Sequence, residues 1–259
     1  MLKYQTLFHS IDKVKLAIER LQAFEPPNRY YLAFSGGKDS IVLYDLAIKS
    51  GVGFDAHYSN TGIDPPELVK FIRKNYPAVI EHKPKKSFFQ LIPTRGFPTR
   101  QVRWCCEELK EKYFGNDRVV VTGIRWAESS RRKKRGMVEQ CYRTKTKSFV
   151  HPIIDWDNGD IWNYIKHNEL PYCCLYDQGF KRIGCILCPM SGKKMRKLEA
   201  VRYPNYVKAY KLAFRKLLLK YTENESKWAL KWKNEDELFD WWIADNKKQN
   251  EAQINIVFE

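Results

Sequence analysis

Hydrophobic residues along the chain follow two alternating patterns. Short apolar runs predict buried strands at residues 30–34, 54–59, 78–81, 118–122 and 149–153. Segments with apolar residues at helical spacing lie before, between and after these runs, at residues 10–24, 38–49, 66–75, 103–114 and 158–167. Strands that alternate with helices predict an α/β fold with a doubly wound, mainly parallel sheet. Sheets of this kind bind ligands at the carboxyl ends of their strands.

The pattern changes beyond residue 122. Residues 125–147 are rich in Arg and Lys with little apolar periodicity, which predicts a loop or a mobile arm. Helical spacing returns from Lys193 onward and predicts two helices, at residues 194–221 and 235–248, around a Trp-rich stretch. We therefore expect three regions: an N-terminal helix, an α/β domain, and a basic, Trp-rich helical extension, at residues 1–28, 29–190 and 191–259.

Charge and composition limit the kinds of partner. The chain has 46 Lys and Arg against 30 Asp and Glu, a formal net charge of +16, which favours nucleotides, nucleic acid or acidic proteins. No apolar run approaches the roughly 20 residues of a membrane span, and the N-terminus lacks the apolar core of a signal peptide. We therefore expect a cytoplasmic protein without membrane contact. Its seven cysteines should stay reduced, as metal ligands, nucleophiles or core thiols.

A glycine-containing loop joins the strand predicted at residues 30–34 to the helix that follows it. Glycines let the backbone approach an anion closely, and the start of a helix offers free N–H groups and its positive end. A lysine adds a point charge and two serines add hydroxyl donors, whereas an ordinary Gly-Gly turn, the alternative interpretation, needs none of these. The spacing differs from that of Walker A. We expect phosphates to bind this phosphate loop: Ser35, Gly36, Gly37, Lys38, Asp39 and Ser40.

The phosphate loop is similar to the PP-loop of the ATP-pyrophosphatase superfamily, whose members bind ATP or adenylyl sulfates. Further segments, in the same order along the chain, resemble those of phosphoadenylyl-sulfate and adenylyl-sulfate reductases (the PAPS reductase family): residues 57–67, 104–110, 122–131, 151–164 and 175–188. The resemblance covers about residues 30–190. It implies the adenine nucleotide alpha hydrolase-like fold for this nucleotide-binding domain.

The resemblance also implies which residues bind and act. The family's Thr-Gly element and arginine motif place nucleotide contacts on Thr61, Gly62, Gly123 and Arg125, in addition to the phosphate loop. Asp39 is expected to help hold Mg²⁺ on the phosphates. Cations that would stabilise developing negative charge are the expected catalytic residues: Lys38, Lys110, Arg125 and Arg131.

Four of the cysteines form two pairs, Cys105-Cys106 and a Cys-x-x-Cys at Cys185 and Cys188. Such a pair can direct two thiolates to one metal, and a second pair completes a four-thiolate shell. The chemistry alone permits zinc, an iron–sulfur cluster or no metal. In the adenylyl-sulfate reductases that the chain resembles, the same set holds a four-iron four-sulfur cluster, and we expect that cluster here. Lys110, one helical turn beyond Cys106, is expected to face the cluster and an anionic substrate, or else to be a solvated helix lysine.

The other three cysteines lie outside this set. Cys173 and Cys174 are interpreted as small core residues, a common role for cysteine, or else as reactive thiols. Cys141, close to Arg143, fits the description of a nucleophilic thiol, since nearby arginines lower a thiol pKa.

The chain departs from the family at its C-terminal end. Assimilatory reductases of this family attack the sulfate group with a cysteine in a C-terminal Glu-Cys-Gly motif, and no cysteine follows Cys188 here. We therefore expect adenylation-linked sulfur transfer from ATP or an adenylyl sulfate, with nucleic acid as a candidate acceptor and a sulfur donor or thioredoxin-like protein as a candidate partner. Two alternatives stay open. One is an adenylyl-sulfate or phosphoadenylyl-sulfate reductase that uses an unusual thiol, and the other is a non-catalytic nucleotide-binding iron–sulfur sensor.

Two basic segments are candidate phosphate contacts. Residues 131–135 carry five consecutive Arg or Lys, and residues 193–197 carry four cations with Arg202 and two tyrosines beyond them. Each segment is expected to track nucleic-acid phosphates, or to be a solvated surface; the first could instead close over a bound nucleotide.

Overall fold

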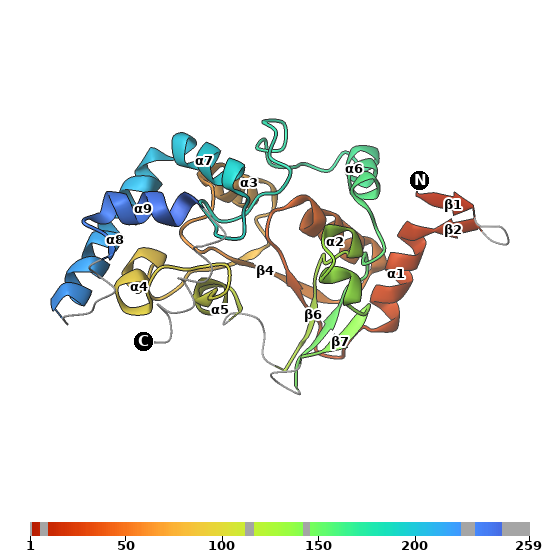
Figure 1. Cartoon of the computed structure of the whole chain (residues 1–259). Helices are drawn as coiled ribbons and strands as arrows, with labels where there is room; N and C mark the ends of the chain where they lie inside the picture. Colours follow the sequence, from red (N-terminus) through yellow and green to blue (C-terminus); the bar gives the residue numbers. More distant parts are fainter. Residues whose placement is uncertain (1, 6–9, 112–116, 142–145, 224–230, 245–259) are drawn as a thin grey trace. The chain divides into compact units, whose positions relative to one another are not determined.

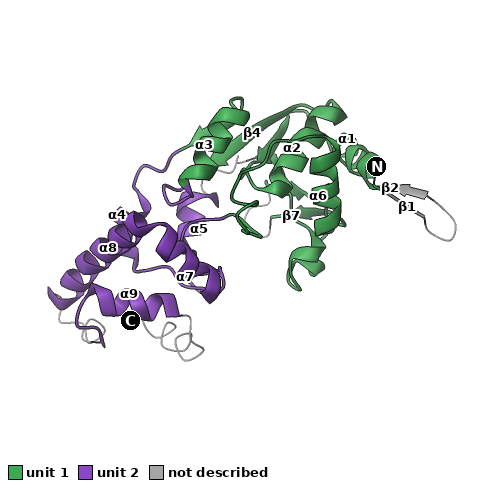
Figure 2. Cartoon of the chain, turned by 90° about the horizontal axis from the view of Figure 1, so that it is seen from above, with its two compact units in different colours: residues 1–59, 66–82, 113–183 green, residues 60–65, 83–112, 184–259 purple. Residues whose placement is uncertain are grey.

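The computed structural model describes residues 2–5, 10–111, 117–141, 146–223 and 231–244. The chain divides into two compact units, coloured green and purple in Figure 2. Unit 1 consists of residues 1–59, 66–82 and 113–183, and unit 2 of residues 60–65, 83–112 and 184–259. No helix in the described residues is long and apolar enough to cross a membrane. The expected regions 1–28, 29–190 and 191–259 stay a prediction.

Unit 1 contains a six-stranded sheet, preceded in the chain by a short hairpin of β1 (Lys3–Gln5) and β2 (Ser10–Asp12) (Figure 1). The strand order of the sheet is β5-β4-β3-β6-β8-β7, and all neighbours are parallel except β7 and β8. The strands are β3 (Tyr30–Ala33), β4 (Phe54–Ser59), β5 (Ile80–His82), β6 (Val119–Val121), β7 (Val138–Gln140) and β8 (Ser148–Val150). This confirms the predicted doubly wound, mainly parallel α/β sheet.

The helices of unit 1 are α1 (Lys13–Ala23), α2 (Lys38–Ser50), α3 (Pro66–Asn75) and α6 (Asn158–His167). α1 and α2 cover one face of the sheet: Tyr30 of β3 donates a hydrogen bond to the Leu21 carbonyl of α1, and Tyr44 of α2 packs edge-on against Phe54 of β4. α2 also packs against α6. From β3 the chain runs outward to β4 and β5 and then returns to β6 on the other side of β3, so the gap between β3 and β6 is the topological switch point where such sheets bind ligands.

Unit 2 is helical and has an aromatic core. Its helices are α4 (Phe88–Arg95), α5 (Trp104–Leu109), α7 (Lys193–Arg202), α8 (Pro204–Glu223) and α9 (Glu235–Ala244). α8 packs against α4 and α9. Ring pairs such as Phe88 with Trp104 and Tyr210 with Trp242, whose centroids lie 5.5 and 5.1 Å apart, fill the space between the helices.

The secondary structure predicted from the sequence was wrong or incomplete at several places. The loop expected over residues 125–147 contains β7 and two short 3-10 helices, η2 (Trp126–Glu128) and η3 (Arg132–Lys134). β7 has a single apolar residue because it is an edge strand, held by backbone pairing with β8. The helix expected over residues 194–221 is two helices, since Pro204 pushes the preceding residue out of helical geometry. The parts of the expected helices at residues 112–114 and 245–248 lie outside the described residues.

Candidate functional site

The phosphate loop, residues 35–40, leaves the carboxyl end of β3 and turns into α2. Gly36 has a φ of +68°, and a Cβ atom there would lie 2.6 Å from Cγ1 of Ile72, so both the backbone and the packing require glycine. The backbone N–H of Ser35 donates to the Ser40 hydroxyl at 3.2 Å, and that hydroxyl donates to the Gly37 carbonyl at 2.8 Å. The two serines therefore fix the shape of the turn.

The first turn of α2 carries the positive end of the helix. Gly37 is the N-cap and offers no side-chain acceptor, but the backbone N–H of Lys38 donates to the hydroxyl of Tyr176 at 2.9 Å. A glycine cap and a helix start at the switch point form an anion-binding arrangement. Tyr176 was not singled out from the sequence.

A chain of ion pairs crosses the first turn of α2. The Lys38 ammonium lies 3.1 Å from Oδ2 of Asp39, and Nε of Arg125 donates to Oδ1 of the same carboxylate at 2.7 Å. Arg125 is only 1% exposed, and its other nitrogens donate to the Trp156 carbonyl and the Asn158 side chain, at 3.2 and 3.0 Å. Arg125 therefore holds the Asp39 carboxylate in place, and through it the Lys38 ammonium.

Gly123 allows this contact to form. A Cβ atom on Gly123 would lie 3.1 Å from the Cβ of Asp39 and 3.2 Å from its carbonyl carbon and oxygen. The segment after β6 therefore approaches the first turn of α2 as closely as a glycine permits. Gly123 and Arg125 both belong to the same unit as the phosphate loop, and their expected contacts with a nucleotide stay a prediction.

Arg131 differs from Arg125 in its exposure to solvent. It is exposed and directly precedes η3, and within the same basic segment Arg132 pairs with Glu128 and Arg135 with Glu139. The exposed cations of the segment are Arg131, Lys133 and Lys134. On α7, Arg196 is 2% exposed, with its guanidinium 4.4 Å from the ring centroid of Trp242, so its expected place on a basic surface was wrong.

The four paired cysteines all lie in unit 2. Cys105 and Cys106 lie in the first turn of α5, and Cys185 and Cys188 lie in the turn before α7. The thiol of Cys185 donates to Oδ1 of Asp64 at 3.6 Å, and Asp64 also accepts the backbone N–H of Thr61 at 2.9 Å. Asp64 is buried and was not singled out from the sequence.

Hydrogen bonds, burial and nearby charges shift the pKa values of these groups. The pKa of the Cys106 thiol is lowered to about 6, chiefly by the hydrogen bond from Cys105 and then by Lys110 and Arg103, against the effect of burial. Burial raises the pKa of Cys185 to about 12, and Lys110 opposes this shift. The charge of Cys185 is the largest of the causes that raise the pKa of Lys110. Lys110 therefore lies within electrostatic reach of Cys185 and Cys106, and its expected role facing a cluster and a substrate stays a prediction.

Residues of the C-terminal helices hold the Cys-x-x-Cys turn. The Glu199 carboxylate accepts the backbone N–H of Leu187 at 2.7 Å, and the Tyr210 hydroxyl donates to the Ile186 carbonyl at 3.0 Å. Leu187 has a φ of +59°, a left-handed conformation that costs a branched side chain about 1–2 kcal/mol and needs such support. Burial raises the pKa of Glu199 to about 7. None of these contacts has a signal in the local sequence.

Four cysteine sulfurs are chemically suitable ligands for a thiolate-bound metal ion or cluster. A hydrogen bond with Cys106 and burial raise the pKa of Cys105, and the charges of Cys106, Cys185 and Cys188 add to this shift, so these three sulfurs lie within electrostatic reach of Cys105. Across the described residues, however, no three or more His, Cys, Asp or Glu side chains have the geometry of a metal site. The four cysteines therefore have the right chemistry but not the geometry of a closed shell.

The predicted nucleotide contacts fall in different units. Thr61 and Gly62 lie in unit 2, with the cysteines, whereas the phosphate loop, Gly123 and Arg125 lie in unit 1. The Thr61 hydroxyl lies 3.7 Å from the sulfur of Cys185, and Gly62 has a φ of +77°. Thr61 and Gly62 as nucleotide contacts stay a prediction.

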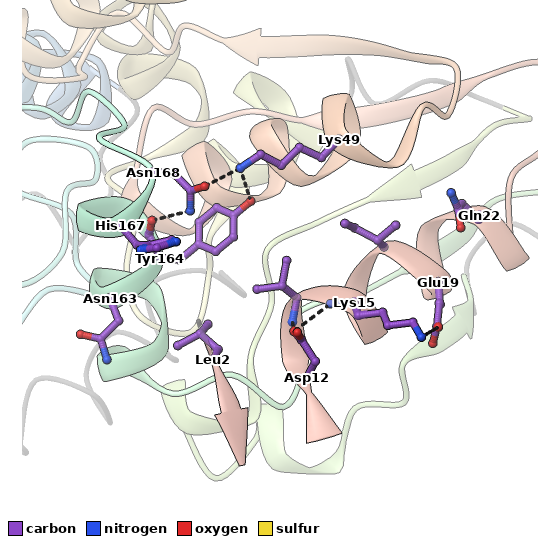
Figure 3. A pocket seen from close by; sticks show the side chains of 12 residues that line it. Leu2, Asp12, Lys15, Glu19, Gln22, Lys49, Asn163, Tyr164, His167 and Asn168 are labelled. Atoms are coloured by element: carbon purple, nitrogen blue, oxygen red, sulfur yellow. Dashed lines mark hydrogen bonds and ion pairs between the residues drawn. The ribbon is translucent and has the colours of Figure 1, made fainter. Parts of the chain in front are cut away.

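A cavity of about 440 Å³ opens in unit 1 at the other end of α2 (Figure 3). α2 runs from Lys38 at the phosphate loop to Lys49 at the cavity, a rise of about 16 Å, so this cavity lies apart from the phosphate loop. In Figure 3, Lys49 points toward Tyr164 and Asn168 of the α6 region, while α1 supplies the opposite wall. Its lining is Leu2, Asp12, Val14, Lys15, Ile18, Glu19, Gln22, Lys49, Asn163, Tyr164, His167 and Asn168.

Most of the chain is similar in sequence to known proteins. Residues 29–191 match the family model described as the phosphoadenosine phosphosulfate reductase domain. An uncharacterized protein of Methanocaldococcus jannaschii is 34% identical over 199 residues, which are 72% of this chain and 48% of that protein. An adenosine 5'-phosphosulfate reductase of Bacillus anthracis is 26% identical over 73% of this chain and 88% of its own length. The chain spans about half or less of the length of the two Methanocaldococcus relatives that it matches.

Two solved structures share the fold. The phosphoadenylyl-sulfate reductase of Candida auris superimposes with a TM-score of 0.52 at 21% identity, over 68% of this chain and 88% of that one. The FMN adenylyltransferase of Candida glabrata gives a TM-score of 0.52 at 15% identity, over 67% of this chain and 63% of that one. At these identities the likeness concerns the fold, which is the adenine nucleotide alpha hydrolase-like fold that the sequence predicted.

Proposed function

The chain belongs to the phosphoadenosine phosphosulfate reductase domain family, and we propose that it is an enzyme that binds ATP or an adenylyl sulfate with the anionic end on the phosphate loop. The observation that carries this proposal is the geometry of residues 35–40. Gly36 is held in a left-handed conformation at the switch point of the sheet, directly before the positive end of α2. The same loop suits the polyphosphate of ATP and the phosphosulfate of an adenylyl sulfate.

Four charged residues in and beyond the phosphate loop have distinct roles in this proposal. Lys38 supplies the charge that neutralises the phosphates, and Asp39 orients Lys38 and helps to hold Mg²⁺. Arg125 acts on the substrate through Asp39, because its guanidinium is buried and donates to protein acceptors. Arg131 is exposed and would be the cation that reaches the substrate from the surface.

The reaction that we propose is adenylation-linked sulfur transfer. An acceptor hydroxyl attacks the α-phosphorus of ATP, an acceptor–AMP bond forms, and pyrophosphate leaves with the electron pair of the broken P–O bond. The hydroxyl proton passes to solvent. Hydrosulfide then attacks the same acceptor atom, the bond from that atom to the AMP oxygen breaks, and AMP leaves with its electron pair. Lys38 stabilises the negative charge that develops on the leaving pyrophosphate.

We also propose a four-iron four-sulfur cluster on Cys105, Cys106, Cys185 and Cys188. Such a cluster, when bound, supplies redox-active iron. The chain itself places Lys110 as a cation and Asp64 as a hydrogen-bond acceptor beside these thiols. Lys110 offsets the negative charge of several thiolates in a buried setting, which would otherwise be costly.

Reduction of an adenylyl sulfate is the second candidate. Relatives named adenosine 5'-phosphosulfate reductase favour it, and so does one feature of unit 1: Cys174 is exposed and lies two residues before Tyr176, which contacts the phosphate loop. A thiol there would attack the sulfur of the sulfate group, AMP would leave, and a thioredoxin-like dithiol would release sulfite from the resulting thiosulfonate. Cys174 was expected in the core, and its exposure makes that expectation wrong.

One experiment separates these functions. The anaerobically prepared chain is mixed with ATP or with adenylyl sulfate, each in the presence of hydrosulfide or a dithiol, and AMP, pyrophosphate and sulfite are measured separately. Sulfur transfer gives AMP and pyrophosphate from ATP once an acceptor is present. Reduction gives AMP and sulfite from adenylyl sulfate, and that result would replace our proposal. Nucleotide binding without any of these products would indicate a sensor.

A further inference from the structure

A tyrosine hydroxyl stands at the start of α2, contributed from far along the chain. The oxygen of Tyr176 accepts the backbone N–H of Lys38 at 2.9 Å and would lie 3.5 Å from a Cβ atom on Gly37. Tyr176 therefore provides the N-terminal cap that Gly37 cannot, from 138 residues away in sequence. Both residues belong to unit 1.

The position of this hydroxyl is set by packing outside the phosphate loop. The ring of Tyr176 packs edge-on against Trp162 of α6, with centroids 5.1 Å apart. Its backbone N–H donates to the Cys173 carbonyl, and its carbonyl accepts the N–H of Gly179, both at 3.1 Å. Because the ring and the backbone are both held, the hydroxyl is presented at the loop in a defined position.

The hydrogen-bonding capacity of a phenol decides what this hydroxyl can do. A tyrosine oxygen accepts through its lone pairs and donates one hydrogen. The bond from the Lys38 N–H uses an acceptor position, which leaves the O–H hydrogen for a second acceptor. Burial raises the pKa of Tyr176, so the hydroxyl keeps its proton at neutral pH. The backbone N–H of Lys38, which could otherwise bind an anion directly, is thus occupied by Tyr176. The Tyr176 O–H becomes the donor in its place, about 3 Å farther from the helix.

We propose that Tyr176 is a phosphate-binding residue whose hydroxyl donates to an oxygen of a nucleoside polyphosphate or of pyrophosphate on the phosphate loop. This inference rests on the proposed nucleotide binding and adds to it a ligand-contacting side chain from the segment after α6. The ligand class follows from the donors that meet here: one phenol, the Lys38 ammonium and the loop amides all suit an oxyanion of high charge.

The test compares two tyrosine variants. Tyr176→Phe keeps the ring and its packing on Trp162 but removes the hydroxyl. Tyr172→Phe is the matched control, because Tyr172 also packs edge-on against Trp162, at 5.3 Å, while its hydroxyl bonds to Asp177 instead. Dissociation constants of the full chain for ATP, pyrophosphate and adenosine are measured by calorimetry, with competition for the weaker ligands.

We expect Tyr176→Phe to weaken ATP and pyrophosphate about tenfold, the usual effect of losing one hydrogen bond to a charged group, and to leave adenosine unchanged. Tyr172→Phe should bind all three like the wild type. Unchanged or tighter binding of ATP by Tyr176→Phe would overturn the inference, since the hydroxyl would then be neutral or would block the Lys38 N–H. Equal weakening of adenosine would also overturn it. Failure of the wild-type chain to bind ATP or pyrophosphate would refute the proposed function as well.

Discussion

Individual side chains in unit 1 show how burial changes what a residue can do. Lys38 and Arg125 are both cations beside Asp39, and their exposed fractions are 7% and 1%. All three guanidinium nitrogens of Arg125 donate hydrogen bonds within the protein. A buried guanidinium that loses its carboxylate is strongly destabilised. Substitution of Asp39 would therefore confuse folding with binding, and Lys38 is the better residue to change.

Lys38→Met should weaken ATP binding at least tenfold while the melting temperature stays close to that of the wild type. The substitution removes a charge next to the phosphates but keeps most of the side-chain volume. The control is Lys49→Met on the same helix, at the end remote from the phosphate loop, which should bind ATP normally. Calorimetric titration of both variants measures the difference. Equal affinities for the wild type and Lys38→Met would contradict the phosphate-loop assignment.

A histidine pair on the sheet gives a pH dependence of stability. Nδ1 of His57 lies 2.8 Å from Nε2 of His82, and burial, followed by the charges of His82 and Arg118, lowers the pKa of His57 from 6.5 to about 4. The unfolded chain therefore binds more protons than the folded chain between these values. The stability contributed by neutral His57 is complete above pH 6.5 and is lost as the pH falls toward 4.

His57→Phe should reduce the fall in melting temperature between pH 7 and pH 5, because it removes the titrating group and keeps a ring to stack on Tyr31. His151 has a similarly lowered pKa of about 4 and will retain part of the slope. His167→Gln, an exposed histidine on α6, is the control and should behave as the wild type. Thermal unfolding curves at both pH values measure the effect. An unaltered slope in His57→Phe would show that His57 does not contribute.

At the scale of elements, glycine positions decide whether the phosphate loop can form. Gly36→Ala should destabilise the chain by about 2 kcal/mol or more, since the left-handed φ of +68° and the 2.6 Å approach to Ile72 both oppose a Cβ atom. Gly51→Ala at the other end of α2 is the control, because its φ is +74° but nothing lies within 4 Å of the added atom. Denaturant unfolding should show a smaller loss, about 1 kcal/mol, for Gly51→Ala. Equal losses in the free energy of unfolding would mean that the Ile72 side chain can move aside without an energetic cost.

The Cys-x-x-Cys turn and the first turn of α5 carry the proposed cluster ligands, and their metal content can be tested. Anaerobically prepared protein should contain iron and sulfide in amounts of about four each per chain, and Cys105→Ser or Cys188→Ser should lose both. Cys141→Ser is the matched control, since Cys141 lies in unit 1 and outside the proposed ligand set. Metal analysis and the visible absorption spectrum measure the content. One zinc per chain without iron would show that the wrong metal was proposed.

The whole molecule carries a formal net charge of +16, and this excess bears on its partners. If nucleic acid is the acceptor, its affinity should fall steeply with salt, because cations release counterions from the phosphates. Changing Arg131, Lys133 and Lys134 together to Gln should reduce the slope of log K against log salt by about 3. Lys15→Gln on α1, whose side chain is 78% exposed, is the control. Absence of binding even at low salt would remove nucleic acid as the acceptor.

The sequence by itself determined the features that depend on near neighbours in the chain. Apolar runs followed by helical spacing identified most of the parallel strands, and a strand–glycine–helix order identified the phosphate loop. These signals are local because strand and helix periods repeat over a few residues. The family was also recognisable from ordered short motifs, and the fold followed from it.

Only the tertiary structure decided which side chains meet. The cap on α2 comes from Tyr176, the cysteine turn is held by Glu199, and Arg125 is directed to Asp39 and not outward. The basic pattern of α7 concealed Arg196, which is buried on Trp242. Each of these contacts joins segments far apart in sequence, so no local period marks it. It forms because a buried polar group must find a partner, and the nearest one in space is set by the packing of the whole unit.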